Sequence, residues 1–499
     1  MASSSPVLDK SLSPPARPAL SAVLLAAAGA VRAVMEGRSL TDALAEVPVP
    51  LRPATQAVSF HAMRQLGWAS AIGSGLVQRS PGAQFDALLN VSLALLKEPT
   101  FQAEAAQAGG SLGACGGQVR QSAPVGAESD TAHSDSEAAN SANLSPDAAP
   151  PVALPGMPVY APYTVVNQAI TAAAGQRSLA SYKGLLNACL RRFLRERDEI
   201  EAAVADLPEA RWNHPRWWVE QLHRAYPGHW QEILAAANVP APMTLRVNTR
   251  RTSREQVCDA FQAAGVAAAV VGQAGLVLAE PRPVTQLPGF AEGWWSVQDA
   301  AAQQAAILLA ARDGERVLDA CAAPGGKTAH VLELADVDMV ALDSDATRLA
   351  RVGQNLDRLG LQSERVTLIA ADASDLDAWW DGKPFDAVLA DVPCTASGIV
   401  RRHPDIRWLR RTQDVGRTAK LQARIVDSLW RTVAPGGRLL YVTCSVFPEE
   451  GERQAQAFAR RHADAQRLDA PGQLLPVALN ATPQAQHDGF FYALFAKRP

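Results

Sequence analysis

Short apolar runs alternate with segments of helical pattern from about residue 290 to the C-terminus. Six of these runs have the length of strands: 315–320, 337–343, 365–372, 384–391, 437–444 and 490–496. Runs this uniformly apolar are typical of parallel strands, which helices cover on both faces of the sheet. The alternation therefore predicts a doubly wound, Rossmann-like α/β domain over residues 290–499.

Two cysteines, Cys394 and Cys444, sit where two of the predicted strands end. Cys394 closes the run LADVPC, and Cys444 closes the run LLYVTC. The carboxyl ends of parallel strands are where α/β folds place their ligands. Two thiols there, with Asp391 beside one of them, favour covalent chemistry on an electron-poor ring. A lone buried cysteine is more often a small apolar side chain, and we interpret the cysteines before residue 290 in that way.

The chain before residue 290 divides by composition. Residues 1–18 are rich in Ser and Pro and are predicted to be a disordered tail. Helical patterns fill 19–205, except for 103–156, a low-complexity insert of Ala, Gly, Ser and Asp that cannot bury a core. Residues 206–289 begin as helix and continue as strand, helix and strand. We expect a small helical and α+β domain there, so the whole chain is predicted to be multidomain.

Length and charge narrow the class of protein. A chain of 499 residues with 48% hydrophobic content can bury several cores, which predicts two to four domains. A net charge of −3 argues against nonspecific coating of nucleic acid, so an RNA contact must be a local basic patch. No two cysteines are spaced as CxxC, and we expect no metal site.

One apolar stretch, Leu20–Ala30, faintly resembles a secretory signal. We interpret it as a buried or amphipathic helix that follows the Ser- and Pro-rich tail. No other stretch approaches the length and apolarity of a membrane span, so we expect no membrane partner. Scattered cysteines fit a reducing compartment, and we expect a cytoplasmic protein.

The run DACAAPGGKTAHVLEL (319–334) reads as a strand, a Gly-Gly turn and a helix, which lets backbone approach a ligand closely. A phosphate-binding loop would need glycine where Cys321 stands, and GxGxxG is absent. Asp343, Asp372 and Asp391 end the next three predicted strands. Carboxylates in that series, without a diphosphate cradle, favour an adenosyl group such as that of S-adenosyl-L-methionine. The alternative is that each aspartate only caps the following helix.

Several long motifs resemble the RNA cytosine-5 methyltransferases of the Nol1/NOP2/Sun superfamily. They are DACAAPGGKT, DVPCTASG, RRHPDIRW and TCSVFPEEGE in the catalytic region, with HPRWWVEQLHRAYPGHW, LRVN, LPGFAEGWWSVQDAAAQ and DGFFYALFAK outside it. The helical region with GLLNACLRRF resembles a NusB-like RNA-binding domain. The resemblance covers roughly 20–102 and 157–499. One departure is Thr395-Ala396-Ser397, where the family more often has Ser, then Gly or Ala, then Thr.

The resemblance implies a role for each motif residue. Cys444 would be the nucleophile, Cys394 would assist release of the product, and Asp391 would contact ring nitrogen 3 and the exocyclic amine. Cys394 as nucleophile, the arrangement of DNA cytosine methyltransferases, stays open as an alternative. The residues expected to hold S-adenosyl-L-methionine are Cys321, Ala322, Ala323, Pro324, Gly325, Gly326, Lys327, Asp343, Asp372 and Asp391.

A basic stretch follows the first cysteine motif, with nine Arg or Lys against three Asp in residues 401–431. Such a patch predicts phosphate contacts, although an ordinary solvated helix face is the alternative. The residues expected to contact RNA are Arg401, Arg402, His403, Arg407, Arg410 and Arg411. The resemblance implies a monomer that acts on 16S rRNA. A tRNA cytosine-5 methyltransferase, a noncatalytic assembly factor and a nucleotide-dependent enzyme are the competing hypotheses.

Overall fold

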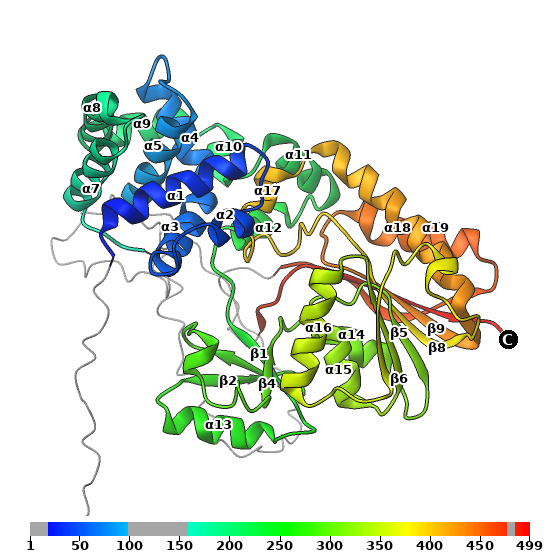
Figure 1. The fold of residues 1–499 in the computed structure, drawn as a ribbon. Helices are drawn as coiled ribbons and strands as arrows, with labels where there is room; N and C mark the ends of the chain where they lie inside the picture. The colour runs from blue at the N-terminus through cyan, green and yellow to red at the C-terminus, as the bar shows by residue number, and fades with distance from the viewer. Residues whose placement is uncertain (1–17, 98–157, 477–484) are drawn as a thin grey trace, which may run out of the picture. The chain divides into compact units, whose positions relative to one another are not determined.

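The computed structural model describes residues 18–97, 158–476 and 485–499, which form two compact units (Figure 1). The helical unit contains the described residues up to Lys97, those from 158 to Gln221, and His403–Arg411. The sheet unit contains Leu222–Arg402 and the described residues of Thr412–Pro499. The predicted insert and all but the last residue of the predicted tail lie outside the described residues. Among the described helices, none has the length and apolarity needed to cross a bilayer.

The helical unit is built around an apolar first helix. Its helices are α1 (Leu20–Met35), α2 (Leu40–Ala45), α3 (Arg52–Arg64), α4 (Leu66–Leu76), α5 (Ala83–Leu96), α7 (Pro162–Gly175), α8 (Lys183–Arg195), α9 (Arg197–Val204), α10 (Pro208–Trp212) and the start of α11 (Arg216–Ala225). Half of α1 is buried against its neighbours, so the interpretation of Leu20–Ala30 as a buried helix is confirmed. In α8 the buried residues Leu186, Leu190 and Phe193 recur at helical spacing and face the same core.

A segment from the second half of the chain completes this unit. Within it, α17 (Ile406–Leu409) packs Trp408 and Leu409 against the helical core. The indole of Trp408 donates to the carbonyl of Met63 at 2.9 Å. The carboxylate of Asp405 accepts from the backbone N–H of Leu40, the first residue of α2, at 2.9 Å. Residues 403–411 are therefore held by the helical unit, although they follow the first cysteine motif by fewer than ten residues.

The sheet unit begins with a small α+β layer. Its strands are β1 (Thr244–Val247), β2 (Ala268–Val271), β3 (Gly275–Leu278) and β4 (Trp295–Val297), paired antiparallel in the order β2-β3-β1-β4. The helix α13 (Arg254–Ala263) packs against them, and α12 (Trp230–Ala237) precedes them in the chain. Ser253 begins α13 with a capping box that also uses Gln256. The predicted small α+β fold is confirmed. The strands β1 and β3 were predicted from the sequence, whereas β2 and β4 were missed.

The large sheet carries all six predicted strands. They are β5 (Arg316–Asp319), β6 (Asp338–Asp343), β7 (Val366–Ala370), β8 (Phe385–Asp391), β9 (Val433–Thr443) and β11 (Phe490–Lys497). The order is β10-β11-β9-β8-β5-β6-β7, with parallel pairing from β9 to β7 and antiparallel pairing at β11 and β10. The missed strand is β10 (Ala465–Leu474), whose polar residues and inner Pro-Gly fit an edge strand.

Alternating side chains of the sheet supply two cores. In β9, Leu440 and Val442 face α14 (Gln304–Leu309), α15 (Gly326–Leu334) and α16 (Ala346–Leu359), whereas Leu439 and Tyr441 face α18 (Thr412–Thr432) and α19 (Glu452–Arg461). Helices therefore cover both faces of the sheet, as Figure 1 shows. This confirms the predicted doubly wound domain, and it explains why the strands read as continuous apolar runs.

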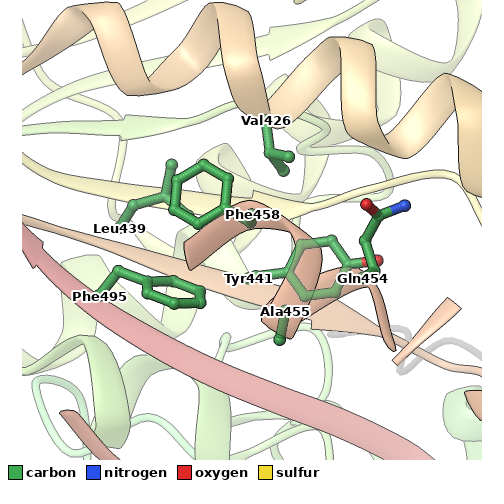
Figure 2. Close-up of a pocket in the computed structure, with 7 residues that line it drawn as sticks. All are labelled: Val426, Leu439, Tyr441, Gln454, Ala455, Phe458 and Phe495. Atoms are coloured by element: carbon green, nitrogen blue, oxygen red, sulfur yellow. The ribbon is translucent and has the colours of Figure 1, made fainter. Parts of the chain in front are cut away.

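An apolar gap lies in the second of these cores, under α18 and α19 (Figure 2). It is lined by Val426, Leu439, Tyr441, Gln454, Ala455, Phe458 and Phe495. Its two polar lining groups already have partners, because the Tyr441 hydroxyl donates to the Glu450 carbonyl at 2.7 Å and the Gln454 amide donates to the Ala419 carbonyl at 2.6 Å. The gap is therefore part of the core packing and offers no polar group to a ligand.

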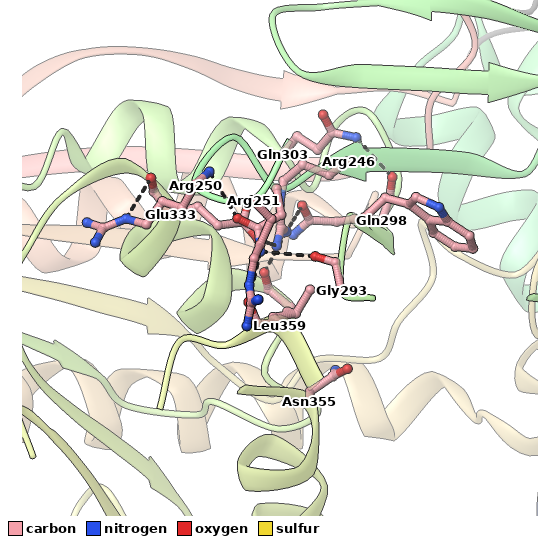
Figure 3. A network of polar contacts seen from close by, with 12 residues as sticks. Arg246, Arg250, Arg251, Gly293, Gln298, Gln303, Glu333, Asn355 and Leu359 are labelled. Carbon is pink, nitrogen blue, oxygen red and sulfur yellow. Dashed lines mark hydrogen bonds and ion pairs between the residues drawn. The ribbon is translucent and has the colours of Figure 1, made fainter. Parts of the chain in front are cut away.

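Figure 3 shows a buried polar network that joins the small layer to the large sheet. The guanidinium of Arg246 on β1 donates to the two carboxylate oxygens of Glu333 on α15, each at 2.7 Å. It also donates to the side chain of Gln298 and, at 2.7 Å, to the carbonyl of Gly326, the first residue of α15. Arg246 is fully buried, so this bidentate pair is shielded from water. The bond from Arg246 to Gly326 fixes the start of α15 against β1.

We expect Glu333→Gln to destabilise the protein strongly, because it leaves the buried Arg246 without its counter-charge. Removing one partner of a buried pair costs about 3–5 kcal/mol. Urea unfolding followed by tryptophan fluorescence measures the loss. The matched control is Arg365→Ala, which removes a solvent-exposed arginine from its pairs with Asp336 and Asp338. Equal effects of the two variants would contradict the importance assigned to the buried pair.

Candidate active site

Parallel pairing of β8 with β9 brings the two predicted thiols together. Asp391, the last residue of β8, pairs in register with Val442 of β9, so both strands end at the same edge of the sheet. Cys394 lies three residues beyond β8, and Cys444 lies directly after β9. Their Sγ atoms are 3.2 Å apart, and both side chains are partly exposed. Both thiols can therefore reach the same part of a bound ligand.

A lysine and a carboxylate lie beside this pair. The ammonium of Lys327, on the first turn of α15, donates to Asp391 Oδ2 at 2.6 Å. Burial alone would lower the pKa of Lys327, but the charges of Asp391 and Cys444 outweigh it and hold the pKa above its ordinary value. The lysine therefore stays positive, and a nearby cation stabilises a thiolate. Lys327 and Cys444 are thus coupled by charge.

The surroundings of Cys394 are different. A hydrogen bond with the Cys444 sulfur, burial, and the charge of Glu450 all raise the pKa of the Cys394 thiol well above its ordinary value. The two sulfur atoms are in contact, yet one faces a cation and the other faces a carboxylate. A negative charge on Cys394 is therefore disfavoured.

The predicted cofactor loop joins β5 to α15. Gly325 has φ +93°, and a Cβ built there would meet Cγ1 of Val352 at 3.0 Å and its Cα at 3.2 Å. Glycine is therefore required for α16 to pack this close to the loop. The other predicted loop residues, 321–324 and 326–327, surround this turn. Burial raises the pKa of the Cys321 thiol well above its ordinary value, which keeps that thiol protonated.

The three predicted carboxylates differ in their places. Asp343 ends β6 as predicted, is 4% exposed, and accepts one backbone N–H on each oxygen, from Ala323 at 3.1 Å and Asp345 at 3.0 Å. Each oxygen keeps one lone pair for a ligand hydroxyl. Asp372 lies two residues beyond the end of β7, at Ala370, so the prediction that it ends the strand was wrong by two residues.

Asp372 is the most exposed of these carboxylates. Its Oδ1 accepts from the backbone N–H of Ser374 at 2.8 Å and from the Ser374 hydroxyl at 2.7 Å. These hydrogen bonds lower the pKa of Asp372. The contact has the form of a local turn, and Asp372 does not cap the following short helix, whose N-cap is Asp375. Its other oxygen lies 3.9 Å from the guanidinium of Arg424, and the side chain is half exposed, so the residue can also face a ligand.

One buried carboxyl beside the site was missed by the sequence reading. Asp319, the last residue of β5, is 1% exposed and accepts a hydrogen bond from the Thr328 hydroxyl at 2.7 Å. Its other oxygen has no hydrogen-bond partner among the described residues. Burial raises the pKa of Asp319 to about 7. The first Asp of DACAAPGGKT was visible in the sequence, but nothing there showed that it would be buried.

The two hydroxyls of the Thr395-Ala396-Ser397 departure both find partners. The Thr395 hydroxyl donates to the carboxylate of Glu450. The Ser397 and Ser445 hydroxyls are 2.9 Å apart, and Ser397 also accepts from the backbone N–H of Val446 at 2.9 Å. The exchange of Ser and Thr therefore leaves the loop fully hydrogen-bonded.

The six residues predicted to contact RNA are divided between the two units. Arg401 and Arg402 belong to the sheet unit, whereas the other four belong to the helical unit: His403, Arg407, Arg410 and Arg411. The side chain of Arg401 is 3% exposed, and Arg407 is fully buried. Burial argues against phosphate contacts for Arg401 and Arg407. The count of arginines in the sequence could not separate buried from exposed ones.

Arg401 and Arg402 instead complete a buried charge cluster. Their guanidiniums donate to separate oxygens of Asp488, each at 2.5 Å. Arg402 also pairs with Asp299 at 2.9 Å, and the backbone N–H of Asp488 donates to Asp299 at 3.1 Å. Two positive and two negative side chains thus balance each other. The cluster ties the motifs RRHPDIRW, WSVQDAAAQ and DGFFYALFAK to the loop that carries Cys394.

Sequence comparison identifies two matching families, which cover most of the sheet unit. Residues 306–496 match the family described as 16S rRNA methyltransferase RsmB/F, and residues 214–285 match the ferredoxin-like domain of RsmF/B-like methyltransferases. Ribosomal RNA small subunit methyltransferase B of Pseudomonas syringae pv. tomato is 47% identical over 328 residues, which cover 63% of this chain and 72% of that protein. Its counterpart in Vibrio cholerae serotype O1 is 44% identical over 324 residues, with 63% and 73% covered.

Solved structures agree on the fold. A methyltransferase homolog protein from Pyrococcus horikoshii is 28% identical, with a TM-score of 0.50, over 58% of this chain and 97% of that chain. NSun6 from Pyrococcus horikoshii, solved with SFG, has a TM-score of 0.51 at 20% identity, over 57% of this chain and 98% of that chain. The second likeness, at this identity, concerns the fold alone.

We expect the stability of the protein to depend on pH through Asp319. Its folded pKa of about 7 lies above the ordinary 3.8, so the folded state holds an extra proton between these values. Stability therefore falls as pH rises through this window and levels off above it. Asp319→Asn removes this dependence. The unfolding free energy of the variant, relative to that of wild type, should therefore rise between about pH 4 and pH 7, and the difference between the folded and the ordinary pKa sets the size of the rise.

Denaturant unfolding at a series of pH values measures this difference. Asp372→Asn is the control with the opposite sign, because hydrogen bonds lower the pKa of Asp372 and its contribution is lost only as pH falls through that lowered pKa. Parallel curves for Asp319→Asn and wild type across the window would contradict the buried, protonated carboxyl.

Proposed function

Because the chain belongs to the RsmB/F family of 16S rRNA methyltransferases, we propose that it methylates carbon 5 of a cytosine through a covalent thiol adduct. Its activity is that of a 16S rRNA cytosine methyltransferase. The observation that carries the carbon-5 proposal is the contact of the Cys394 and Cys444 sulfur atoms at 3.2 Å, beside Asp391. A methylation at an exocyclic oxygen or nitrogen needs no thiol.

Cys444 is the proposed nucleophile. Carbon 5 of cytosine is too electron-poor to attack a methyl group until a thiolate adds to carbon 6 and pushes electrons toward it. The cation of Lys327 is coupled by charge to Cys444, whereas the hydrogen bond to Cys444, burial and Glu450 raise the pKa of Cys394. This difference supports the assignment over its alternative, in which Cys394 attacks. The target base must leave its stack to reach the thiol.

Asp391 is the proposed contact for the activated ring. Addition at carbon 6 makes ring nitrogen 3 more basic, and a carboxyl group can contact it and accept from the exocyclic amine. Lys327, 2.6 Å from that carboxylate, holds it in place and compensates its charge. After carbon 5 gains the methyl group, its proton passes to a base and the sulfur–carbon bond breaks. Cys394, 3.2 Å from the departing sulfur, is the proposed aid to this step.

The proposed cofactor is S-adenosyl-L-methionine, which supplies the methyl group when bound. The loop 321–327 and its glycine turn would face the adenosyl group, and Asp343 would accept from its two ribose hydroxyls. The free lone pair on each oxygen of Asp343 fits this role. Asp372 is the proposed contact for the adenine edge, and Asp391 closes the series next to the thiols.

The proposed track for the RNA backbone is the outer face of α18. Arg417, Lys420, Arg424 and Arg431 are exposed and recur at spacings of three, four and seven residues. Such residues share one helix face, opposite the buried Ile425 and Leu429. Phosphates would bind along this stripe. The helical unit is the proposed second RNA contact, as a NusB-like domain.

We expect three variants to separate the thiol roles. Methyl transfer from labelled S-adenosyl-L-methionine to protein-free small-subunit rRNA is measured for wild type, Cys444→Ala and Cys394→Ala. Cys444→Ala should be inactive, because no sulfur can add to the ring. Cys394→Ala should accumulate a covalent RNA adduct that is visible on a denaturing gel. Cys258→Ala, a buried core cysteine in α13, is the matched control and should stay active.

If Cys444→Ala accumulates the adduct instead, the two roles are exchanged. If wild type transfers no methyl group to rRNA but does so to tRNA, the proposed substrate is wrong.

Neutralising the α18 stripe should weaken rRNA binding with a characteristic salt dependence. For the triple variant Arg417→Ala, Lys420→Ala and Arg424→Ala, the slope of log affinity against log salt should fall by about one for each lost phosphate contact. Filter binding at several salt concentrations measures the slope. Arg365→Ala removes a partly exposed arginine at the amino end of β7 and should leave the slope unchanged. An unchanged slope in the triple variant would show that RNA does not follow this face.

A further inference from the structure

A buried carboxylate, Glu450, is the meeting point of both cysteine loops. It lies six residues after Cys444, at the end of the short turn Pro448–Glu450, and it is 0% exposed. Its Oε1 accepts from the backbone N–H of Thr395, next to Cys394, at 2.8 Å. Its Oε2 accepts from the hydroxyl of Ser445, next to Cys444, at 2.6 Å. One side chain therefore binds the neighbour of each thiol.

Four donors converge on this carboxylate. Besides the two bonds above, the Thr395 hydroxyl donates to Oε2, and the amide of Gln422 on α18 donates to Oε1 at 3.2 Å. Gln422 also donates to the carbonyl of Pro393 at 3.0 Å, so this residue of α18 is bonded to both cysteine loops. Four donors fill the acceptor positions of an ionised carboxylate, whereas a protonated one would leave a donor without an acceptor.

The hydroxyls around Glu450 form a directed chain. The Ser445 hydroxyl accepts from the backbone N–H of Phe447 at 3.0 Å and donates its own hydrogen to Glu450. Ser397 must then donate to Ser445, while it accepts from the N–H of Val446. The direction of each bond is set by the carboxylate at the end of the chain. Loss of that charge would disrupt this whole series of hydrogen bonds, and not only one of them.

The charge of Glu450 also faces one thiol more than the other. It raises the pKa of Cys394, together with the hydrogen bond to Cys444 and burial. The groups facing Cys394 are Cys444, Glu450 and the hydroxyl of Tyr441, none of them a cation. The cation of the site, Lys327, is coupled to Cys444. The two sides of the thiol pair thus carry opposite charges.

We propose that Glu450 is a positioning residue that holds both cysteine loops and divides the roles of the two thiols, with Cys394 kept as a thiol while Cys444 attacks. The inference rests on the proposed cytosine-5 chemistry. Glu450 does not reach the substrate, so it acts only through its neighbours. Removing its charge would make Cys394 easier to ionise and would loosen both loops.

The test uses Glu450→Gln, which keeps the size of the side chain and removes its charge. In a Cys444→Ala background, alkylation of Cys394 by iodoacetamide is followed against pH by peptide mapping. We expect the midpoint pH of alkylation to fall in Glu450→Gln. In the background that retains Cys444, kcat for methyl transfer should fall about 100-fold with little change in KM for rRNA, because small displacements of reacting groups cost that much.

Glu449→Gln is the matched control, since this neighbouring carboxylate faces solvent and pairs with Arg453 at 2.7 Å. It should change neither readout. An unchanged alkylation midpoint in Glu450→Gln, with or without loss of thermal stability, would overturn the proposal. If Glu450→Gln does not fold, Gln422→Leu removes the α18 donor from the same carboxylate and should lower kcat in the same way, and an unchanged kcat there would also overturn it.

The alkylation readout needs no RNA. A lowered midpoint in a protein that transfers no methyl group to rRNA would sustain the role of Glu450 in the thiol pair and would reject the proposed reaction. The two failures are therefore distinguishable.

Discussion

Parallel pairing of β8 with β9 is the constraint on which the active site depends. The register that sets Asp391 beside Val442 places the two following loops at one edge of the sheet, and only then can two thiols fifty residues apart touch. Strands of this kind must be buried on both faces, so the apolar runs that form the core also dictate where the chemistry sits. Fold and site have a single physical origin here.

Pairing alone does not fix the conformation of the loops, which have no regular structure of their own. Polar contacts from distant segments do this work. The cluster around Asp488 holds the chain after Cys394, and Gly398 packs so closely on Gly489 that a Cβ would meet a carbonyl oxygen at 2.0 Å. Arg246 holds the start of the cofactor helix in the same manner. The motifs outside the catalytic region therefore hold its loops in place.

Most of the architecture could be predicted because it follows from periodic apolar patterns. The six strands of the large sheet and the meeting of Cys394 with Cys444 belong to this class. Burial of charged residues does not follow from local sequence, since it depends on partners from far along the chain. For that reason the sequence could not show that Arg401 is buried against Asp488, or that Glu450 joins the two cysteine loops. The edge strand β10 was missed because its side chains are mostly polar.

The segment 403–411 bears on how such a protein can be divided. The chain leaves the helical unit after Gln221, builds most of the sheet unit, and returns to the helical unit for nine residues before α18 begins. Each unit is therefore built from segments that are not consecutive in the sequence. A fragment that starts at Leu222 would carry Trp408 and Leu409 without the core they pack against. Exchange of the helical region between relatives thus requires exchange of this short segment as well, because its side chains complete the helical core.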